Sequence, residues 1–263
     1  TGRCSELDFE RFWSQSLARA VAARGLAGEL GGTSPDEAFT VALLSKVGKL
    51  ALATVFPAAY DELLSRSQDD PLVSIRQSEC KQFGLDHNEL SALMMADWHL
   101  PEVFCRAVRI QDAAGRAGED PPRALDVARI LRMSDAIATL LVNPVPYQDD
   151  LSTLLTTAQE CGATQMVISA VYESARDAWR EAGVVFSVPT NEAVPLPELH
   201  CRASREYRRV LVVDDDADCL RLLSKQLSSA GYDVVEARNG VEALRMLHTE
   251  GCRIVVTDWN MPE

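Results

Sequence analysis

The stretch RVLVVDDD, residues 209–216, is an apolar run that ends in three consecutive aspartates. Its valines and leucine are typical of a buried strand of a parallel sheet. A helix is predicted next, because Leu220, Leu223 and Leu227 lie on one helical face and Gly231 follows them. The segment that begins here therefore starts as a strand followed by a helix.

Two further strands complete this pattern. YDVVEA (residues 232–237) and RIVVTD (residues 253–258) are separated by the helical stretch GVEALRML (residues 240–247). Strand–helix–strand–helix–strand predicts a parallel sheet with crossover helices. We therefore expect a multidomain chain, in which an all-α domain precedes a partial α/β unit with flavodoxin-like strand order.

Acidic residues follow two of these strands. Asp214 and Asp215 end the first strand and Asp258 ends the third, and ligands of open parallel sheets bind beyond such carboxyl ends. If the two strands are neighbours, the three carboxylates repel one another unless a cation neutralises them, and hard oxygen ligands favour Mg²⁺. Such a site suits phosphoryl transfer to a carboxylate. Helix capping is the competing explanation, and Asp216 or Asp218 is expected to be a cap.

The motifs VLVVDDD, LSSAGYDVVEARNGVEAL and VVTDWNMPE resemble the response-regulator receiver domain. The resemblance covers residues 208–263 and about the first half of that domain. It implies that Asp258 accepts a phosphoryl group from a histidine kinase and that Asp214 and Asp215 hold Mg²⁺. It also implies that Asn260 offers its backbone carbonyl to the metal. The Ser/Thr and Lys that complete the family's phosphate site would lie beyond this chain.

The preceding residues carry helical periodicity only. Ser34 and Glu37 form a predicted capping box, with Pro35 at the first helical position, for a helix that continues to about Ala53. Another helix is expected to start at Pro101. Four more are predicted over residues 86–98, 123–142, 151–161 and 164–182.

The chain is expected to divide into a helical domain over residues 1–183, a proline-containing linker over 184–207 and the α/β unit over 208–263. It begins with Thr1 and ends inside the α/β pattern. We therefore expect a piece of a longer protein, with part of the helical domain missing at the N-terminal side.

Four stretches of the helical part resemble the HDOD domain, a relative of the HD metal-dependent phosphohydrolases. They are FWSQSLARAVAARGLA, DEAFTVALLSKVGKLALATVFPAAYDELL, FGLDHNELSALMMADWHLP and ALDVARILRMSDAIA. The resemblance implies that the all-α domain is HD-like. HD hydrolases gather imidazoles and carboxylates around one or two metals. At the corresponding positions this chain has the residues Gln15, Ser45, Lys46, His87, Gln111, Asp112 and Asp135.

Only two of those residues, His87 and Asp135, keep the type that the resemblance requires. Lys46 would place a positive charge where the metal should sit. We therefore expect no metal in this domain and a capping or packing role for His87. Trp13, Trp98 and Trp179 are expected to be core anchors rather than stacking surfaces.

Composition restricts the partners. The net charge of −13, from 26 Lys and Arg against 39 Asp and Glu, argues against a broad nucleic-acid or anionic-membrane surface. We find no apolar run approaching the roughly 18 residues of a membrane span. The seven cysteines form no C-x-x-C pair, which favours reduced thiols and a cytoplasmic location.

The leading hypothesis is a phosphoprotein of bacterial two-component phosphorelay signalling, in which the HDOD domain is a non-catalytic module that binds a protein partner. A diguanylate cyclase is one candidate for an output domain beyond this chain. The first alternative is a divergent HD phosphohydrolase that uses His87, Asp112 and Asp135 with a metal. The second is a nucleic-acid regulator, which the acidic composition disfavours.

Overall fold

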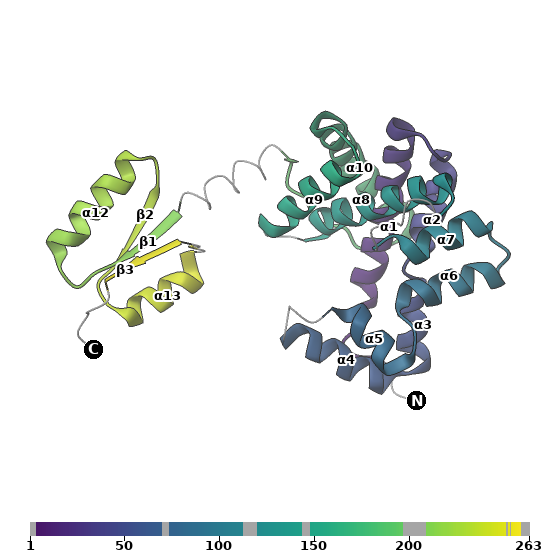
Figure 1. Ribbon diagram of the computed structural model, residues 1–263, viewed down its shortest axis with the longest axis horizontal. Helices are drawn as coiled ribbons and strands as arrows, with labels where there is room; N and C mark the ends of the chain where they lie inside the picture. Colours follow the sequence, from purple (N-terminus) through teal and green to yellow (C-terminus); the bar gives the residue numbers. More distant parts are fainter. Residues whose placement is uncertain are drawn as a thin grey trace. The chain divides into compact units, whose positions relative to one another are not determined.

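The structure is a computed structural model that describes residues 4–69, 74–112, 120–143, 148–196, 209–250, 252 and 254–258. The chain divides into two compact units, Thr1–Val194 and Pro195–Glu263. The first is helical and the second contains the sheet (Figure 1). The expected order of an all-α domain and an α/β unit is therefore confirmed.

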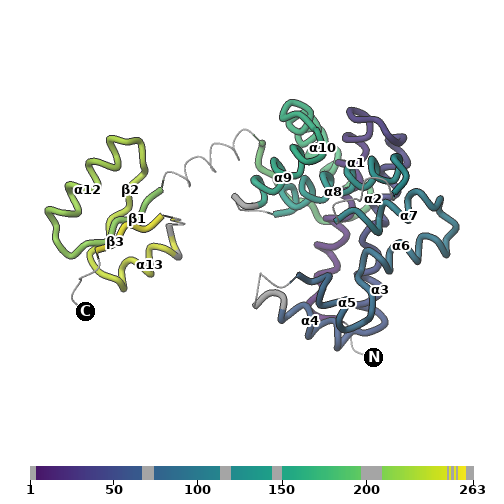
Figure 2. Tube along the Cα trace, viewed as in Figure 1, coloured from purple at the N-terminus to yellow at the C-terminus, as the bar shows by residue number. Residues whose placement is uncertain are grey.

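The described part of the first unit contains ten α-helices. They are α1 (Phe9–Leu30), α2 (Pro35–Leu44), α3 (Val47–Val55), α4 (Pro57–Asp69), α5 (Ile75–Phe83), α6 (His87–Asp97), α7 (Glu102–Ile110), α8 (Pro122–Val142), α9 (Gln148–Glu160) and α10 (Gln165–Phe186). Helix α1 packs against α2, α8 and α10 (Figure 2). It is therefore a central element of the unit.

Two predicted helix starts are confirmed in detail. The Ser34 hydroxyl accepts a hydrogen bond from the Glu37 amide at 3.2 Å, and the Glu37 carboxylate accepts from the Ser34 amide at 3.1 Å. These bonds, with one from Thr33, help to lower the pKa of Glu37 to about 2. Asp86 caps α6 by accepting from the Glu89 amide at 2.8 Å.

The single helix predicted through Ala53 is in fact two. Helix α2 ends at Leu44 and α3 begins at Val47, because the buried side chain of Lys46 turns toward polar partners on α6 and after α7.

The expectation about apolar runs also needs correction. Pro35–Val55 is long and apolar enough to cross a membrane by length and composition, although a core segment of a folded domain passes the same test.

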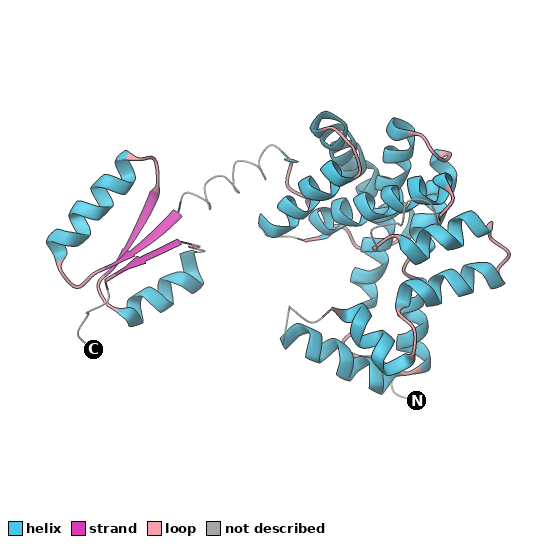
Figure 3. Cartoon of the chain, viewed as in Figure 1, coloured by secondary structure: helices cyan, strands magenta, loops and turns pink. Residues whose placement is uncertain are grey.

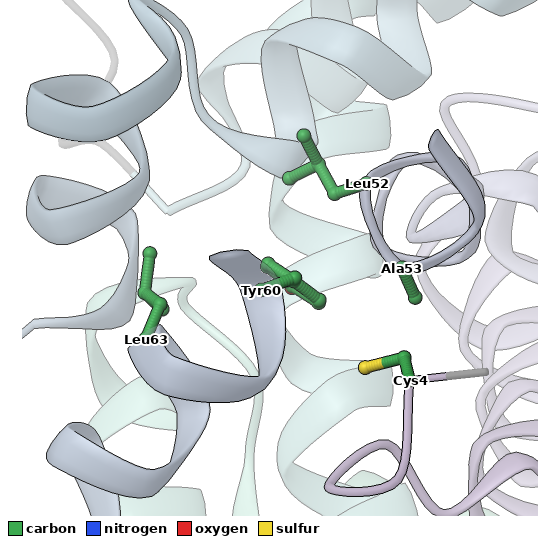
Figure 4. Packing of buried hydrophobic residues seen from close by; sticks show 5 residues of the cluster. All are labelled: Cys4, Leu52, Ala53, Tyr60 and Leu63. Atoms are coloured by element: carbon green, nitrogen blue, oxygen red, sulfur yellow. The ribbon is translucent and has the colours of Figure 1, made fainter. Parts of the chain in front are cut away.

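Helices α4 and α5 were missed by the sequence analysis. Tyr60 and Leu63 of α4 pack with Leu52 and Ala53 of α3 and with Cys4 in one buried cluster (Figure 4). The sequence does carry a start signal for α4, because Pro57 occupies its first position. This cluster holds the N-terminal segment against the turn between α3 and α4.

The segment after α10 packs on the helical unit. The Ser14 hydroxyl donates to the Pro189 carbonyl at 2.5 Å, and the Tyr172 hydroxyl donates to the Val194 carbonyl at 2.8 Å. The Asn191 side chain donates to the carbonyl of Val142 at 2.7 Å. The helical unit thus includes the first part of the segment predicted as a linker, while residues 197–208 lie outside the described residues.

The second unit has the predicted topology. Its elements are β1 (Arg209–Val213), α12 (Ala217–Ser229), β2 (Asp233–Ala237), α13 (Gly240–Glu250) and β3 (Ile254–Thr257). The three strands lie side by side (Figure 3) and are parallel, in the order β2-β1-β3. The β1 residues alternate between two clusters, one with α12 and one with α13, so each face of β1 is covered by a helix.

Candidate functional site

The strongest candidate site lies at the carboxyl end of the sheet. Asp214 follows β1 and Asp258 follows β3, and these strands are adjacent. The Asp258 amide donates to the Val213 carbonyl at 3.0 Å, which extends the strand pairing to the residue itself. Side-chain oxygens of Asp214, Asp215 and Asp258 all lie within 4.8 Å of one another. The strand order therefore brings the predicted trio together.

The three carboxylates differ in exposure. Asp214 is buried, whereas Asp215 and Asp258 are exposed. One Asp214 oxygen accepts from the Asp216 amide at 2.9 Å, which fixes its orientation. Asp216 caps α12 by accepting from the Asp218 amide at 2.8 Å. The capping explanation is thus correct for Asp216, while Asp214 and Asp215 meet Asp258.

The aspartates that follow β1 and β3 produce a negative electrostatic field at the start of α12. The pKa of the exposed Cys219 thiol is raised, chiefly by the nearby charges of Asp216 and Asp214 and in part by that of Asp258. Hard oxygen ligands at this separation fit a Mg²⁺ ion that keeps several waters. The predicted fourth contributor, Asn260, lies outside the described residues.

The positions predicted as a degenerate metal site lie in the helical unit, and a lysine occupies their centre. The Lys46 ammonium donates to Asn88 Oδ1 and to Asp112 Oδ2, each at 3.0 Å. Gln111 donates to the same Asn88 oxygen at 3.2 Å. Lys46 is buried, so an ammonium group neutralises Asp112 from inside the domain. This agrees with the positive charge that the sequence analysis expected at the position of the metal.

Asp135 is held by a cation that the sequence analysis missed. Arg19 on α1 donates from Nε to Asp135 Oδ1 at 2.7 Å, and its Nη2 lies 2.6 Å from the same oxygen in an ion pair. Burial alone would raise the pKa of Asp135, but the charges of Arg19, Lys46 and Lys49 outweigh burial and hold it well below its usual range. Arg19 lies one helical turn after Gln15, which is half-buried. The four-residue spacing from Gln15 to Arg19 was the sequence signal that could have placed Arg19 at this site.

His87 is a packing residue, as expected. Its Nδ1 lies 2.6 Å from Glu79 Oε2, and the other Glu79 oxygen accepts from the Tyr60 hydroxyl at 2.8 Å. Burial lowers the pKa of His87 to about 4, despite the opposing effect of Glu79. The imidazole is therefore neutral at physiological pH. Neither Tyr60 nor Glu79 carried a sequence signal that linked it to His87.

Ser45, another of the predicted positions, makes its hydrogen bond within its own turn. The buried Ser45 hydroxyl donates to the Ala42 carbonyl of its own turn at 2.8 Å. Across the described residues, the acidic trio is the group of three potential ligands that converges closely enough for a metal.

The expected core role is confirmed for Trp179, which is fully buried, but it is wrong for Trp13 and Trp98, which are each 46% exposed.

Comparisons with known proteins agree with both units. The HDOD domain model matches residues 1–114, and the response regulator receiver domain model matches residues 210–263. Chemotaxis protein CheY1 of Helicobacter pylori is 46% identical over 57 residues, which cover 21% of this chain and 46% of CheY1. The chain thus spans less than half the length of this relative.

Two solved structures resemble the chain. The MmoQ response regulator of Methylococcus capsulatus is 31% identical, with a TM-score of 0.53, over 65% of this chain and 64% of MmoQ. A Shewanella amazonensis protein provisionally assigned as a phosphohydrolase is 21% identical, with a TM-score of 0.55, over 69% of this chain and 66% of that protein. The second likeness concerns the fold alone. The family models thus find an HDOD domain followed by a response regulator receiver domain in this chain.

Proposed function

We propose that this chain is a two-component signalling protein whose receiver domain accepts a phosphoryl group on Asp258 from a histidine kinase. The convergence of Asp214, Asp215 and Asp258 at adjacent strand ends carries this proposal. Asp258 is exposed, so its carboxylate can meet a phosphodonor. The similarity to CheY1 supports the same assignment.

In the proposed reaction, an Asp258 carboxylate oxygen attacks the phosphorus of the kinase phosphohistidine. A P–O bond forms, the P–N bond breaks and the imidazole leaves. Asp214 and Asp215 would hold Mg²⁺, which offsets the charge of the phosphoryl group and of the carboxylates. The buried Asp214, oriented by the Asp216 amide, supplies the more fixed ligand.

The acyl phosphate on Asp258 would carry a charge close to −2 at pH 7, where the free carboxylate carries −1. We propose that this local change biases the rest of the protein, with the HDOD domain as a non-catalytic regulatory module. The acidic composition favours a protein partner rather than nucleic acid or an anionic membrane. Reduced thiols at six described cysteines fit a cytoplasmic protein.

The test is phosphoryl uptake by the full-length protein. Acetyl phosphate with Mg²⁺ should label the wild type, and Asp258→Asn should abolish that labelling. Asp218→Asn is the matched control, because Asp218 is an exposed aspartate nearby that lies outside the trio. Equal labelling of Asp258→Asn and wild type would exclude Asp258 as the acceptor.

A divergent HD phosphohydrolase is the competing proposal for the helical domain. It is disfavoured because the ammonium of Lys46 holds Asp112 and the guanidinium of Arg19 holds Asp135. Metal analysis of the purified protein decides between the two. Stoichiometric Fe, Mn or Zn that survives Asp258→Asn and Asp214→Asn would place a metal in the helical domain and favour the hydrolase.

A further inference from the structure

A small cavity in the helical domain lies between α8 and α9, beside Asp112, the second residue after α7. Its volume is about 260 Å³, and its lining includes Asp112, Asp135, Asp150, Arg132 and Thr157. This is just below the roughly 300–1,000 Å³ typical of ligand pockets. The cavity therefore suits a small and polar ligand.

Two carboxylates of the cavity lining each use only one of their two oxygens in contacts with the protein. Asp112 uses Oδ2 for Lys46 and Asn88, and Asp135 uses Oδ1 for both its hydrogen bond and its ion pair with Arg19. Within the described part of the chain, Asp112 Oδ1 and Asp135 Oδ2 accept no hydrogen bond. The two side chains are 29% and 33% exposed. Nearby cations lower the pKa of both, so both stay ionised.

Thr157 provides an independent sign of a ligand. Thr157 is only 5% exposed and lines the cavity. Its hydroxyl has no hydrogen-bond partner among the described residues. Thr139, which also lines the cavity, instead donates to the Asp135 carbonyl at 3.0 Å. The hydroxyl oxygen is therefore open to the cavity rather than enclosed by protein, and it can bond to a molecule that the cavity holds.

The lining selects the chemistry of the ligand. Free carboxylate oxygens accept hydrogen bonds and repel anions, which excludes phosphates. Arg132 is paired with Glu160, so its charge is already compensated. The carboxylates of Asp112, Asp135 and Asp150 do not form a metal-sized group in the described structure. We propose that this cavity binds a small organic cation that carries a primary ammonium or guanidinium group.

This proposal does not depend on phosphorylation of Asp258, and direct binding tests it. Putrescine and agmatine would be titrated into the purified full chain by calorimetry and by ligand-observed NMR. 1,4-Butanediol is the neutral control, because it matches the shape of putrescine without its charge. Saturable binding of at least one cation, with none of the diol, is expected. Equal binding of diol and diamine, or no saturation by either cation, would overturn the proposal.

Variants locate the site. Thr157→Val replaces the hydroxyl with a methyl group of similar size, and Asp112→Asn removes one charge. Each should weaken cation binding about tenfold, the typical effect of one charge-assisted hydrogen bond. Asp97→Asn is the control, because Asp97 is an exposed aspartate of α6 outside the cavity. A thermal melt of each variant would verify folding, and unchanged affinity in a folded Thr157→Val would refute this site.

Discussion

The two domains use aspartate in opposite ways. In the helical domain, Asp112 and Asp135 each hold a buried cation supplied by the same fold. In the receiver domain, Asp214, Asp215 and Asp258 converge on one another. A carboxylate neutralised from within is part of the scaffold, whereas converging carboxylates require a cation or protons from outside. The difference separates a structural site from a chemical one.

Removing Asp135 should produce the largest change in stability. Asp135→Ala leaves Arg19, whose side chain is only 4% exposed, without its carboxylate. The free energy of unfolding of the helical domain should fall by about 3 kcal/mol. Chemical denaturation followed by fluorescence of the buried Trp179 would measure the loss.

The matched control for that change is Asp126→Ala, on the same helix. Asp126 pairs with Arg129 at the surface, and both side chains are about half exposed. Its loss should cost well under ~1 kcal/mol. If the two variants cost the same, the interior ion pair is not what holds the helical site together, and the contrast with the receiver fails.

Acid should weaken the helical domain through His87. Its pKa in the fold is about 4, below the ordinary 6.5, so the unfolded chain binds the proton first as the pH falls. Stability is therefore full above about pH 6.5 and is lost between pH 6.5 and 4, by up to ~3 kcal/mol. The pKa of Glu79 is also lowered, so its contribution is lost in the same direction at still lower pH.

Unfolding measured from pH 7.5 to 4 in wild type and His87→Gln would test this. The variant should be less sensitive over this interval, because it lacks the group that titrates. His99→Gln, at an exposed histidine, should behave as wild type. Equal pH sensitivity of His87→Gln and wild type would show that His87 is not the residue responsible.

Hydrogen exchange should show the receiver to be the more open domain. Residues Val210–Val213 of β1 are buried, whereas all four residues of β3 are exposed and Val255 is 42% exposed. Amides of β3 should exchange at least about tenfold faster than those of β1, which corresponds to ~1.4 kcal/mol in local opening. Equal protection of β1 and β3 would mean that the edge is closed by contacts outside the described residues.

Sequence predicted the receiver better than the helical domain, for a physical reason. RVLVVDDD and RIVVTD place their acids at strand ends, and parallel pairing then brings Asp214 and Asp258 together without any side-chain detail. The role of Lys46 was also accessible, because a charge at an expected metal position needs a carboxylate partner.

The helical contacts could not be predicted in the same way. Arg19 meets Asp135, and Glu79 meets both His87 and Tyr60, only through tertiary packing between helices distant in sequence. The break between α2 and α3 had the same origin, since an unbroken apolar pattern continues through it. Exposure of Trp98 likewise depends on which helices cover it, and residue type alone favours burial.

The smallest predicted effect has the opposite sign to that of Asp135→Ala. Without Mg²⁺, Asp215→Asn removes repulsion within the trio and should stabilise the receiver slightly, by less than ~1 kcal/mol. With Mg²⁺ the gain should disappear, because the metal has lost a ligand and stabilises the fold less. Thermal unfolding with and without MgCl₂ would show the change in sign. Glu236→Gln, at an exposed position on β2, should leave the Mg²⁺ response unchanged. If it alters that response as much as Asp215→Asn does, the response reflects general charge screening and not a site built by the trio.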